Sequence, residues 1–130
     1  MVAIFYSSDD LLYMLRMLFE RNGFVTAVGH VNALRNGTLD LTAFVQQYRP
    51  AVVVYDLVPP YEQQWAFLDH LRSTSPLSGR PFVLTSTNAR MARELAGRSE
   101  PVVEVLGRPF DFEELLHSVR RVLESPGSPG

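Results

Sequence analysis

The segment that decides the fold is Ala51–Asp56 (AVVVYD), which is followed by Leu57–Pro60 (LVPP). Its run of β-branched and aromatic residues is typical of a strand that is buried on both faces, as in a parallel sheet. Asp56 stands where this strand ends, because the two prolines cannot continue it. In open α/β sheets, ligands and chemistry are found at the carboxyl ends of the strands. Asp56 is therefore a candidate functional residue, although an aspartate here also suits a turn or a helix cap.

The composition is that of one folded domain. A chain of 130 residues with 46% apolar and 11% aromatic residues can bury a core. A net charge of −2 gives no electrostatic basis for binding nucleic acid or an anionic membrane directly. Cysteine is absent, which excludes a disulfide scaffold and thiolate chemistry. We expect a cytoplasmic protein, because the first residues lack the features of a signal peptide and no apolar run has the length of a membrane span.

Strand and helix patterns alternate along the chain. Strands are expected over residues 2–6, 24–28, 51–56, 81–85 and 102–106, and helices over 11–21, 41–48, 62–72, 89–96 and 112–124. Residues 29–40 are loop-like, with a turn of helix over 31–35 as the alternative. Five successive βα units predict an α/β, doubly wound (βα)5 three-layer sandwich with a five-stranded parallel sheet. Residues 1–124 form the expected domain, and residues 125–130 (SPGSPG) are expected to be a disordered linker or tail.

Four strand ends are expected to meet at one edge of this sheet. They deliver the segment Tyr6–Asp9, then Asp56, then Ser86 and finally Arg108. An aspartate, a hydroxyl group and a cation are thereby brought together from distant parts of the chain. Such a set suits phosphoryl handling, with a carboxylate to accept the group and the other two to bind its oxygens.

On these residues the chain resembles the receiver domains of bacterial two-component response regulators, over nearly its whole length. Asp56 matches the phosphoacceptor aspartate, Ser86 matches a Ser or Thr, and Arg108-Pro109-Phe110 resembles the Lys-Pro-Phe junction of the family. The intervals, 30 positions from Asp56 to Ser86 and 22 from Ser86 to Arg108, are usual in receivers. The resemblance implies a flavodoxin-like fold and a signalling module of a phosphorelay rather than an enzyme. It makes Asp56, Ser86 and Arg108 the candidate site residues.

The metal-binding part of the family's site is altered. Counting back from Asn22-Gly23 places Tyr6 and Ser7 where receivers carry the two acidic residues that hold magnesium. Magnesium demands near-octahedral oxygen ligands and usually recruits carboxylates. We therefore expect no cofactor and no metal, or at most weak magnesium binding through Asp56 with Asp9.

Two further departures concern the cation beside the aspartate and the aromatic residue of the family's conformational switch. Arg108 replaces the family's lysine, and its planar guanidinium is suited to clamping a carboxylate, so we expect it to pair with Asp56 rather than to point into solvent. Val105 stands where the family has a switching aromatic residue. These changes predict an atypical receiver that works through protein contacts without conventional magnesium-dependent phosphorylation. The alternative is a conventional phospho-accepting receiver.

The resemblance also implies partners. In receivers, the face made by the fourth helix, fifth strand and fifth helix contacts a histidine kinase, an effector domain or a second receiver, and a homodimer is compatible with that use. Here this face is expected to include Arg90, Arg93, Glu104, His117 and Arg121. We expect no direct contact with nucleic acid or membrane.

Other classes of site are less favoured. Ser7 and Ser8 precede a helix and could cradle the phosphate of a flavin, as in flavodoxin-like cofactor binders. However, Asp9 and Asp10 would repel a phosphate, and the glycines of a phosphate loop are missing. The histidines at 30, 70 and 117 lack the spacing of metal ligands.

Overall fold

The computed structural model describes residues 1–74, 77, 79–97 and 104–124. Five parallel strands form one sheet in the order β2-β1-β3-β4-β5. The strands are β1 (Val2–Tyr6), β2 (Thr26–His30), β3 (Val52–Asp56), β4 (Phe82–Ser86) and β5 (Glu104–Gly107). The helices are α1 (Asp9–Arg21), α2 (Val31–Arg35), α3 (Leu41–Tyr48), α4 (Tyr61–Thr74), α5 (Ala89–Ala96) and α6 (Phe112–Leu123). The predicted doubly wound fold is confirmed.

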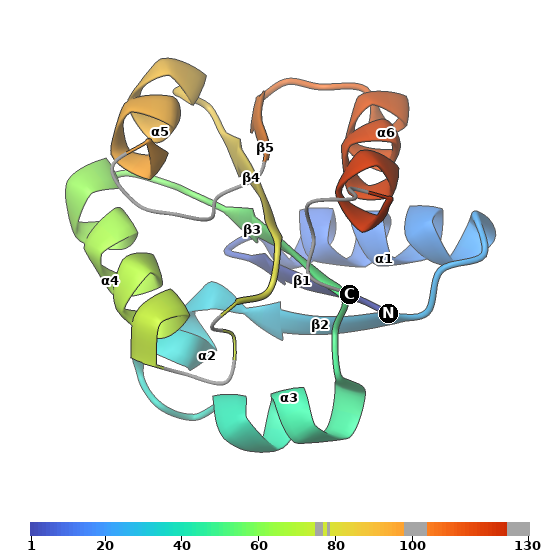
Figure 1. Cartoon of the computed structure of the whole chain (residues 1–130), viewed down its shortest axis with the longest axis horizontal. Helices are drawn as coiled ribbons and strands as arrows, with labels where there is room; N and C mark the ends of the chain where they lie inside the picture. Colours follow the sequence, from blue (N-terminus) through green and yellow to red (C-terminus); the bar gives the residue numbers. More distant parts are fainter. Residues whose placement is uncertain (75–76, 78, 98–103, 125–130) are drawn as a thin grey trace.

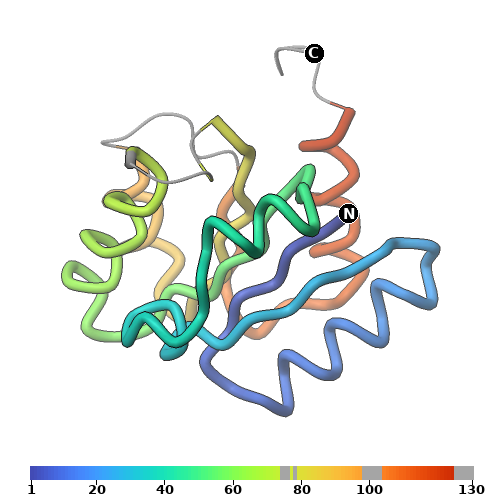
Figure 2. The backbone as a smooth tube through the Cα atoms, turned by 90° about the horizontal axis from the view of Figure 1, so that it is seen from below, coloured from blue at the N-terminus to red at the C-terminus, as the bar shows by residue number. Residues whose placement is uncertain are grey.

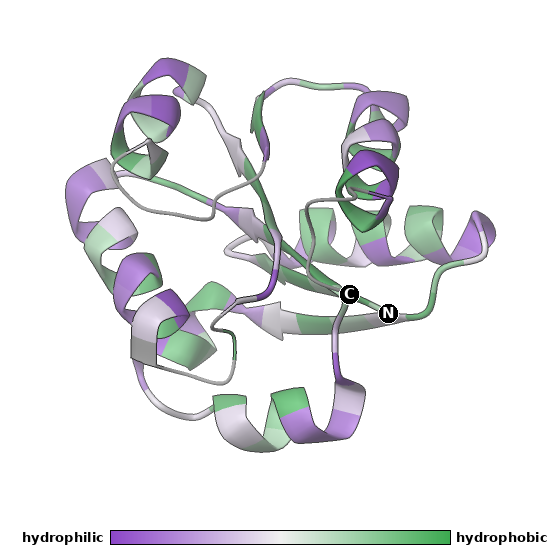
Figure 3. Cartoon of the chain, viewed as in Figure 1, coloured by the Kyte–Doolittle hydropathy of each residue, from purple (hydrophilic) through white to green (hydrophobic). Residues whose placement is uncertain are grey.

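The sheet lies between two layers of helices (Figure 1). On one face, Leu15 and Phe19 of α1 and Leu116 and Val119 of α6 pack in one buried cluster with residues of β1, β3 and β4. On the other face, a second cluster joins the sheet to α2, α3, α4 and α5. The tube in Figure 2 shows the same separation from below, and Figure 3 shows that hydrophobic residues dominate the central strands. Burial of the two clusters drives the three-layer arrangement.

Alternation along the strands decides which side chains reach the functional edge. Val2, Ile4 and Tyr6 of β1 belong to the cluster under α1 and α6, whereas Ala3 and Phe5 belong to the opposite one. Side chains two residues apart share a face of a strand. By this rule Asp56 continues the row of Val52 and Val54 in β3, and Thr85 follows Val83 in β4. Tyr6, Asp56 and Thr85 therefore share one face at the carboxyl edge of the sheet.

The second strand begins two residues later than its sequence pattern indicates. Phe24 packs edge-on against Phe19, with ring centroids 5.6 Å apart, and its backbone N–H donates to the Phe19 carbonyl. Phe24 thus completes the end of α1, and the strand over 24–28 is corrected to Thr26–His30. A Cβ at Gly29 would lie 2.6 Å from the Phe5 ring, so this strand position requires glycine.

The remaining boundaries agree more closely. Residues 31–35 form a helix, which was one of the two alternatives, and α3 begins after Asp40, whose Oδ1 accepts from Ala43 N–H at 3.1 Å. The helix α1 starts at Asp9, two residues earlier than predicted, because Ser8 caps it. The helix α4 is longer than predicted, and β4 and β5 end one residue later. The predicted tail at 125–130 and the start of the fifth strand at 102–103 lie outside the described residues.

No helix in the described part of the chain is long and apolar enough to cross a membrane.

Candidate functional site

The site is built around the carboxylate of Asp56 at the end of β3. Asp56 is only 3% exposed to solvent. The hydroxyl group of Thr85, at the end of β4, donates to Oδ1 at 2.7 Å. A guanidinium N–H of Arg108, which follows β5, donates to Oδ2 at 2.9 Å. Both carboxylate oxygens are therefore hydrogen-bonded by the protein itself, and the expected pair between Asp56 and Arg108 is present.

Tyr6, at the end of β1, extends this arrangement. Its buried hydroxyl oxygen lies 2.6 Å from Oγ1 of Thr85. A threonine hydroxyl has one hydrogen to give. When that hydrogen is donated to the ionised Asp56, the Tyr6 O–H must be the donor toward Thr85. We call the connected set Tyr6, Thr85, Asp56 and Arg108 the rim network.

Burial decides the electrostatics of the rim network. It raises the pKa of Asp56, while the hydrogen bond from Thr85 and the charge of Arg108 act in the opposite direction without fully compensating. Burial also raises the pKa of the Tyr6 hydroxyl. Tyr6 therefore stays protonated at neutral pH and acts as a neutral hydrogen-bond donor rather than as an anionic ligand.

Ser86 lies beside the rim network but not within it. Its buried Oγ accepts from the backbone N–H of Asn88 at 3.1 Å, just before α5. Its backbone carbonyl accepts from the N–H of Arg108 at 2.7 Å, which fixes the position of the arginine. The hydroxyl group that contacts Asp56 is thus that of Thr85. The role of Ser86 toward a phosphoryl group stays a prediction.

Sequence reasoning missed Thr85 and the part played by the Tyr6 hydroxyl. The relevant signal is the strand register, in which Thr85 is the direct neighbour of Asp56 across β3 and β4. A register is not readable from the spacing of two buried strands alone, because shifting one strand by one residue exchanges the faces of all its side chains.

The other acidic residues near this edge lie in the first turn of α1. The side chain of Asp9 is 87% exposed and faces His30, whose Nε2 lies 3.5 Å from Asp9 Oδ1. Asp10 is exposed as well. Among the described residues, no group of three or more His, Cys, Asp or Glu side chains is placed to hold a metal ion.

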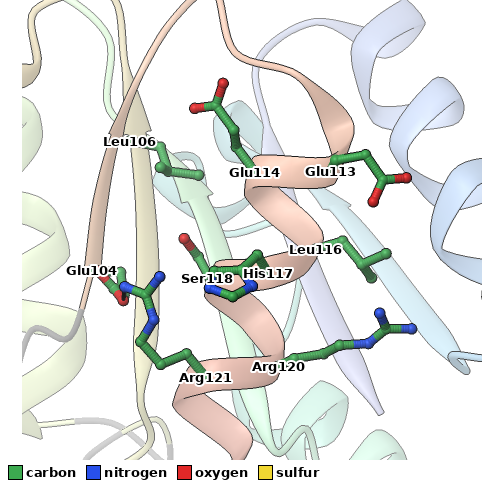
Figure 4. Close-up of a pocket in the computed structure, with 9 residues that line it drawn as sticks. All are labelled: Glu104, Leu106, Glu113, Glu114, Leu116, His117, Ser118, Arg120 and Arg121. Carbon is green, nitrogen blue, oxygen red and sulfur yellow. Dashed lines mark hydrogen bonds and ion pairs between the residues drawn. The ribbon is translucent and has the colours of Figure 1, made fainter.

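A shallow pocket of about 520 Å³ lies between β5 and α6 (Figure 4). Glu104 and Arg121 form an ion pair across it, and His117 points into the same region from α6. Arg93 of α5 reaches the backbone carbonyl of Val105 at 3.4 Å. Arg93, Glu104, His117 and Arg121 of the predicted contact face thus lie around β5, whereas Arg90 pairs with Glu94 along α5.

No protein-family model matches the chain. Over 122 residues the chain is 25% identical to protein PilH of Pseudomonas aeruginosa. This alignment covers 94% of this chain and 96% of PilH. Over 80 residues it is 28% identical to response regulator Rre1 of a Synechocystis species, but this match covers 62% of the chain and only 35% of Rre1.

Solved structures share the fold. A signal receiver domain of a two-component histidine kinase from Clostridium thermocellum superimposes with a TM-score of 0.74 at 18% identity. The match covers 95% of this chain and 97% of that domain. At this identity the likeness establishes the architecture, a five-stranded flavodoxin-like sheet with flanking helices, and not the chemistry.

Proposed function

We propose that this chain, whose fold and relatives support a response-regulator receiver domain, is an atypical member of that class. It acts as a signalling module through protein contacts, without conventional magnesium-dependent phosphorylation of Asp56. The observation that supports the proposal is that the carboxylate of Asp56 is buried and hydrogen-bonded within the protein. Asp56 is buried, and each of its oxygens already accepts a hydrogen bond from Thr85 or Arg108.

Phosphorylation of an aspartate requires a carboxylate oxygen with a free lone pair in line with the phosphorus atom. It also requires cations that neutralise the charge of the transferred group. Each oxygen of Asp56 keeps a second lone pair, but the residue is only 3% exposed and Thr85 and Arg108 occupy one acceptor site on each oxygen, so the in-line approach of a donor molecule is restricted. Arg108 is the one cation in contact with the carboxylate among the described residues, and that contact is already made with the ground state. Such an arrangement stabilises the unmodified aspartate instead of the transition state.

The donor atoms near Asp56 do not fit a magnesium ion. Magnesium is held by carboxylates and water in near-octahedral geometry. The position equivalent to one acidic ligand of the family carries Tyr6, a neutral phenol engaged with Thr85, and the next position carries Ser7. Asp9 is directed to His30. We therefore propose that the charge of Arg108 takes the place of the divalent cation beside Asp56.

The proposed contact surface is the α5-β5-α6 face. It corresponds to the fourth helix, fifth strand and fifth helix of the family, because α2 adds one helix to the numbering. Its polar and charged side chains, among them Glu104, His117 and Arg121, line the pocket in Figure 4. We propose that a kinase, an effector domain or another receiver binds here independently of any modification of Asp56.

The test is to treat the protein with magnesium and a small phosphodonor, such as acetyl phosphate, and to measure its intact mass. We expect no phosphoryl adduct on the wild type. We also expect unchanged amide chemical shifts for β5 and α6. An adduct that forms on the wild type and is lost in Asp56→Asn would overturn the proposal in favour of the conventional phospho-accepting receiver.

A second experiment returns an acid to the metal position. Tyr6→Asp places a second carboxylate beside Asp56, where the two negative charges repel each other. We expect its thermal midpoint to rise on addition of magnesium, because a cation relieves this repulsion. The matched control, Tyr6→Asn, has the same shape without the charge and is expected to show no magnesium response. A magnesium-dependent rise in the wild type would contradict the proposed lack of a metal site.

A further inference from the structure

The outer face of α1 is apolar in its middle and charged at its ends. Five exposed residues recur at helical spacing and cover about 100° of the helix circumference, opposite the core-facing side chains of Leu12, Leu15 and Phe19. They are Asp10, Tyr13, Met14, Met17 and Arg21. We call this set the α1 stripe.

The middle of the α1 stripe is unusually apolar for a surface. Tyr13 is 65% exposed, Met14 46% and Met17 45%. Single exposed apolar residues are normal, but a contiguous group marks a contact surface. Methionine and tyrosine suit such a surface because methionine adapts its shape and tyrosine provides a large, rigid contact area. The helix lies along the outside of the molecule (Figure 2), so the stripe is accessible to another molecule.

The charges at the two ends have opposite signs. Asp10 lies in the first turn of α1 and Arg21 in the last, roughly 16 Å apart along the axis at 1.5 Å per residue. Within the described residues, neither side chain makes an ion pair. A helix with an acidic start, an apolar middle and a basic end is complementary to a second copy of itself lying antiparallel.

We propose that α1 is a self-association surface, on which two copies of this chain pack their α1 stripes antiparallel about a two-fold axis. The register follows from the residue numbers. Placing Asp10 of one copy opposite Arg21 of the other also places Met14 opposite Met17, and the symmetry repeats both contacts. Tyr13 flanks the methionines on each side. The pairing uses no residue of the rim network, so it holds whether or not Asp56 is modified.

The dimer is expected to be weak. One helix face per copy buries less than the roughly 1,200–2,000 Å² of a standard stable interface. Association should therefore depend on protein concentration, and it should fall as salt screens the two terminal ion pairs.

The test is sedimentation equilibrium over a range of concentrations, with circular dichroism to check that each variant is folded. The wild-type mass should rise from the 14.7 kDa monomer toward twice that value. Met17→Glu should weaken association by roughly tenfold or more, since it puts a charge in the apolar centre twice per dimer. Leu123→Glu on α6, a residue 41% exposed outside the stripe, is the matched control and should associate like the wild type.

Charge reversal tests the antiparallel register. Asp10→Arg and Arg21→Asp should each weaken self-association, because every ion pair of the homodimer becomes a like-charge pair. An equimolar mixture of the two variants should associate again, and so should the double variant, because both combinations restore opposite charges across the axis. A wild type that stays monomeric at every concentration, or a mixture that stays monomeric while the wild type associates, would overturn the proposal.

Discussion

The rim network and the α1 stripe break the usual distribution of residues in opposite ways. In the rim network, polar groups are withdrawn from water, and each finds its partner inside the same chain. In the α1 stripe, apolar groups remain in water on the side of the helix that faces away from the core. Buried polar groups that satisfy each other have little left to offer a ligand, whereas exposed apolar groups gain by being covered. The difference teaches that the recognisable site of a protein and its available surface need not coincide.

The largest expected effect comes from breaking the rim network at its centre. Thr85→Val removes the hydroxyl that joins Tyr6 to Asp56 and leaves two buried polar groups without that partner. We expect a loss of about 2–6 kcal/mol in the free energy of unfolding, at about 1–3 kcal/mol for each of the two unsatisfied groups. Urea denaturation followed by circular dichroism measures this change.

Thr87, two residues after Thr85, supplies the matched control. Its hydroxyl also meets a tyrosine, with Tyr61 Oη at 2.8 Å, but this pair is exposed to water. Thr87→Val should therefore cost less than about 1 kcal/mol, because water replaces the lost bond. Equal losses for the two valine variants would show that burial does not strengthen the rim network.

The pH dependence of stability gives a smaller effect. Burial holds the pKa of Asp56 above the 3.8 of an ordinary aspartate, so the folded state binds its proton more tightly than the unfolded state does. The stability contributed by this group is complete below the unfolded pKa and is lost as pH rises through the folded one. Relative to Asp56→Asn, the wild type should lose about 1.4 kcal/mol for each unit by which the folded pKa exceeds the unfolded one.

Denaturation of both proteins between pH 4 and 7 measures this difference. The Asn variant keeps the shape of the side chain and removes the titration. A wild type that gains stability over Asp56→Asn as pH rises would mean that Arg108 outweighs the desolvation of the carboxylate.

The smallest expected effect is in the α1 stripe. In the monomer, Met17→Gln should change the free energy of unfolding by less than about 0.5 kcal/mol, because both residues favour helix and the side chain is half exposed. The same substitution should weaken association of the two copies. Thermal unfolding in dilute solution, where the chain is monomeric, measures the change in the free energy of unfolding. A loss of several kcal/mol would show that Met17 packs in the monomer and does not serve only the interface.

Much of the fold could be predicted from the sequence, because the apolar patterns and the turn residues agreed with each other. The Val-rich run before Asp56 forms β3, and the apolar periodicity over residues 11–21 and 112–124 correctly indicated the helices α1 and α6. The second strand was placed wrongly, since Phe24 and Val25 look like strand residues but Phe24 packs on Phe19. Tertiary contacts overrode local propensity there.

The candidate site could be predicted from the sequence only in part. Spacing indicated that Asp56 and Arg108 would meet, because strand ends share an edge. It did not indicate that Thr85 rather than Ser86 contacts the carboxylate, since that depends on the register of β3 against β4. The apolar outer face of α1 was also missed. Tyr13, Met14 and Met17 extend the helical pattern of apolar residues, and only the packed structure shows which of them face the core.

The carboxylate of Asp56 fastens several parts of the architecture. Through Thr85 and Tyr6 it connects the ends of β3, β4 and β1, and through Arg108 it holds the segment that leaves β5. Replacing this one side chain would loosen all of these attachments. An aspartate at this position therefore has a structural role that does not depend on phosphorylation, and its presence in a sequence is not by itself a sign of signalling by phosphate.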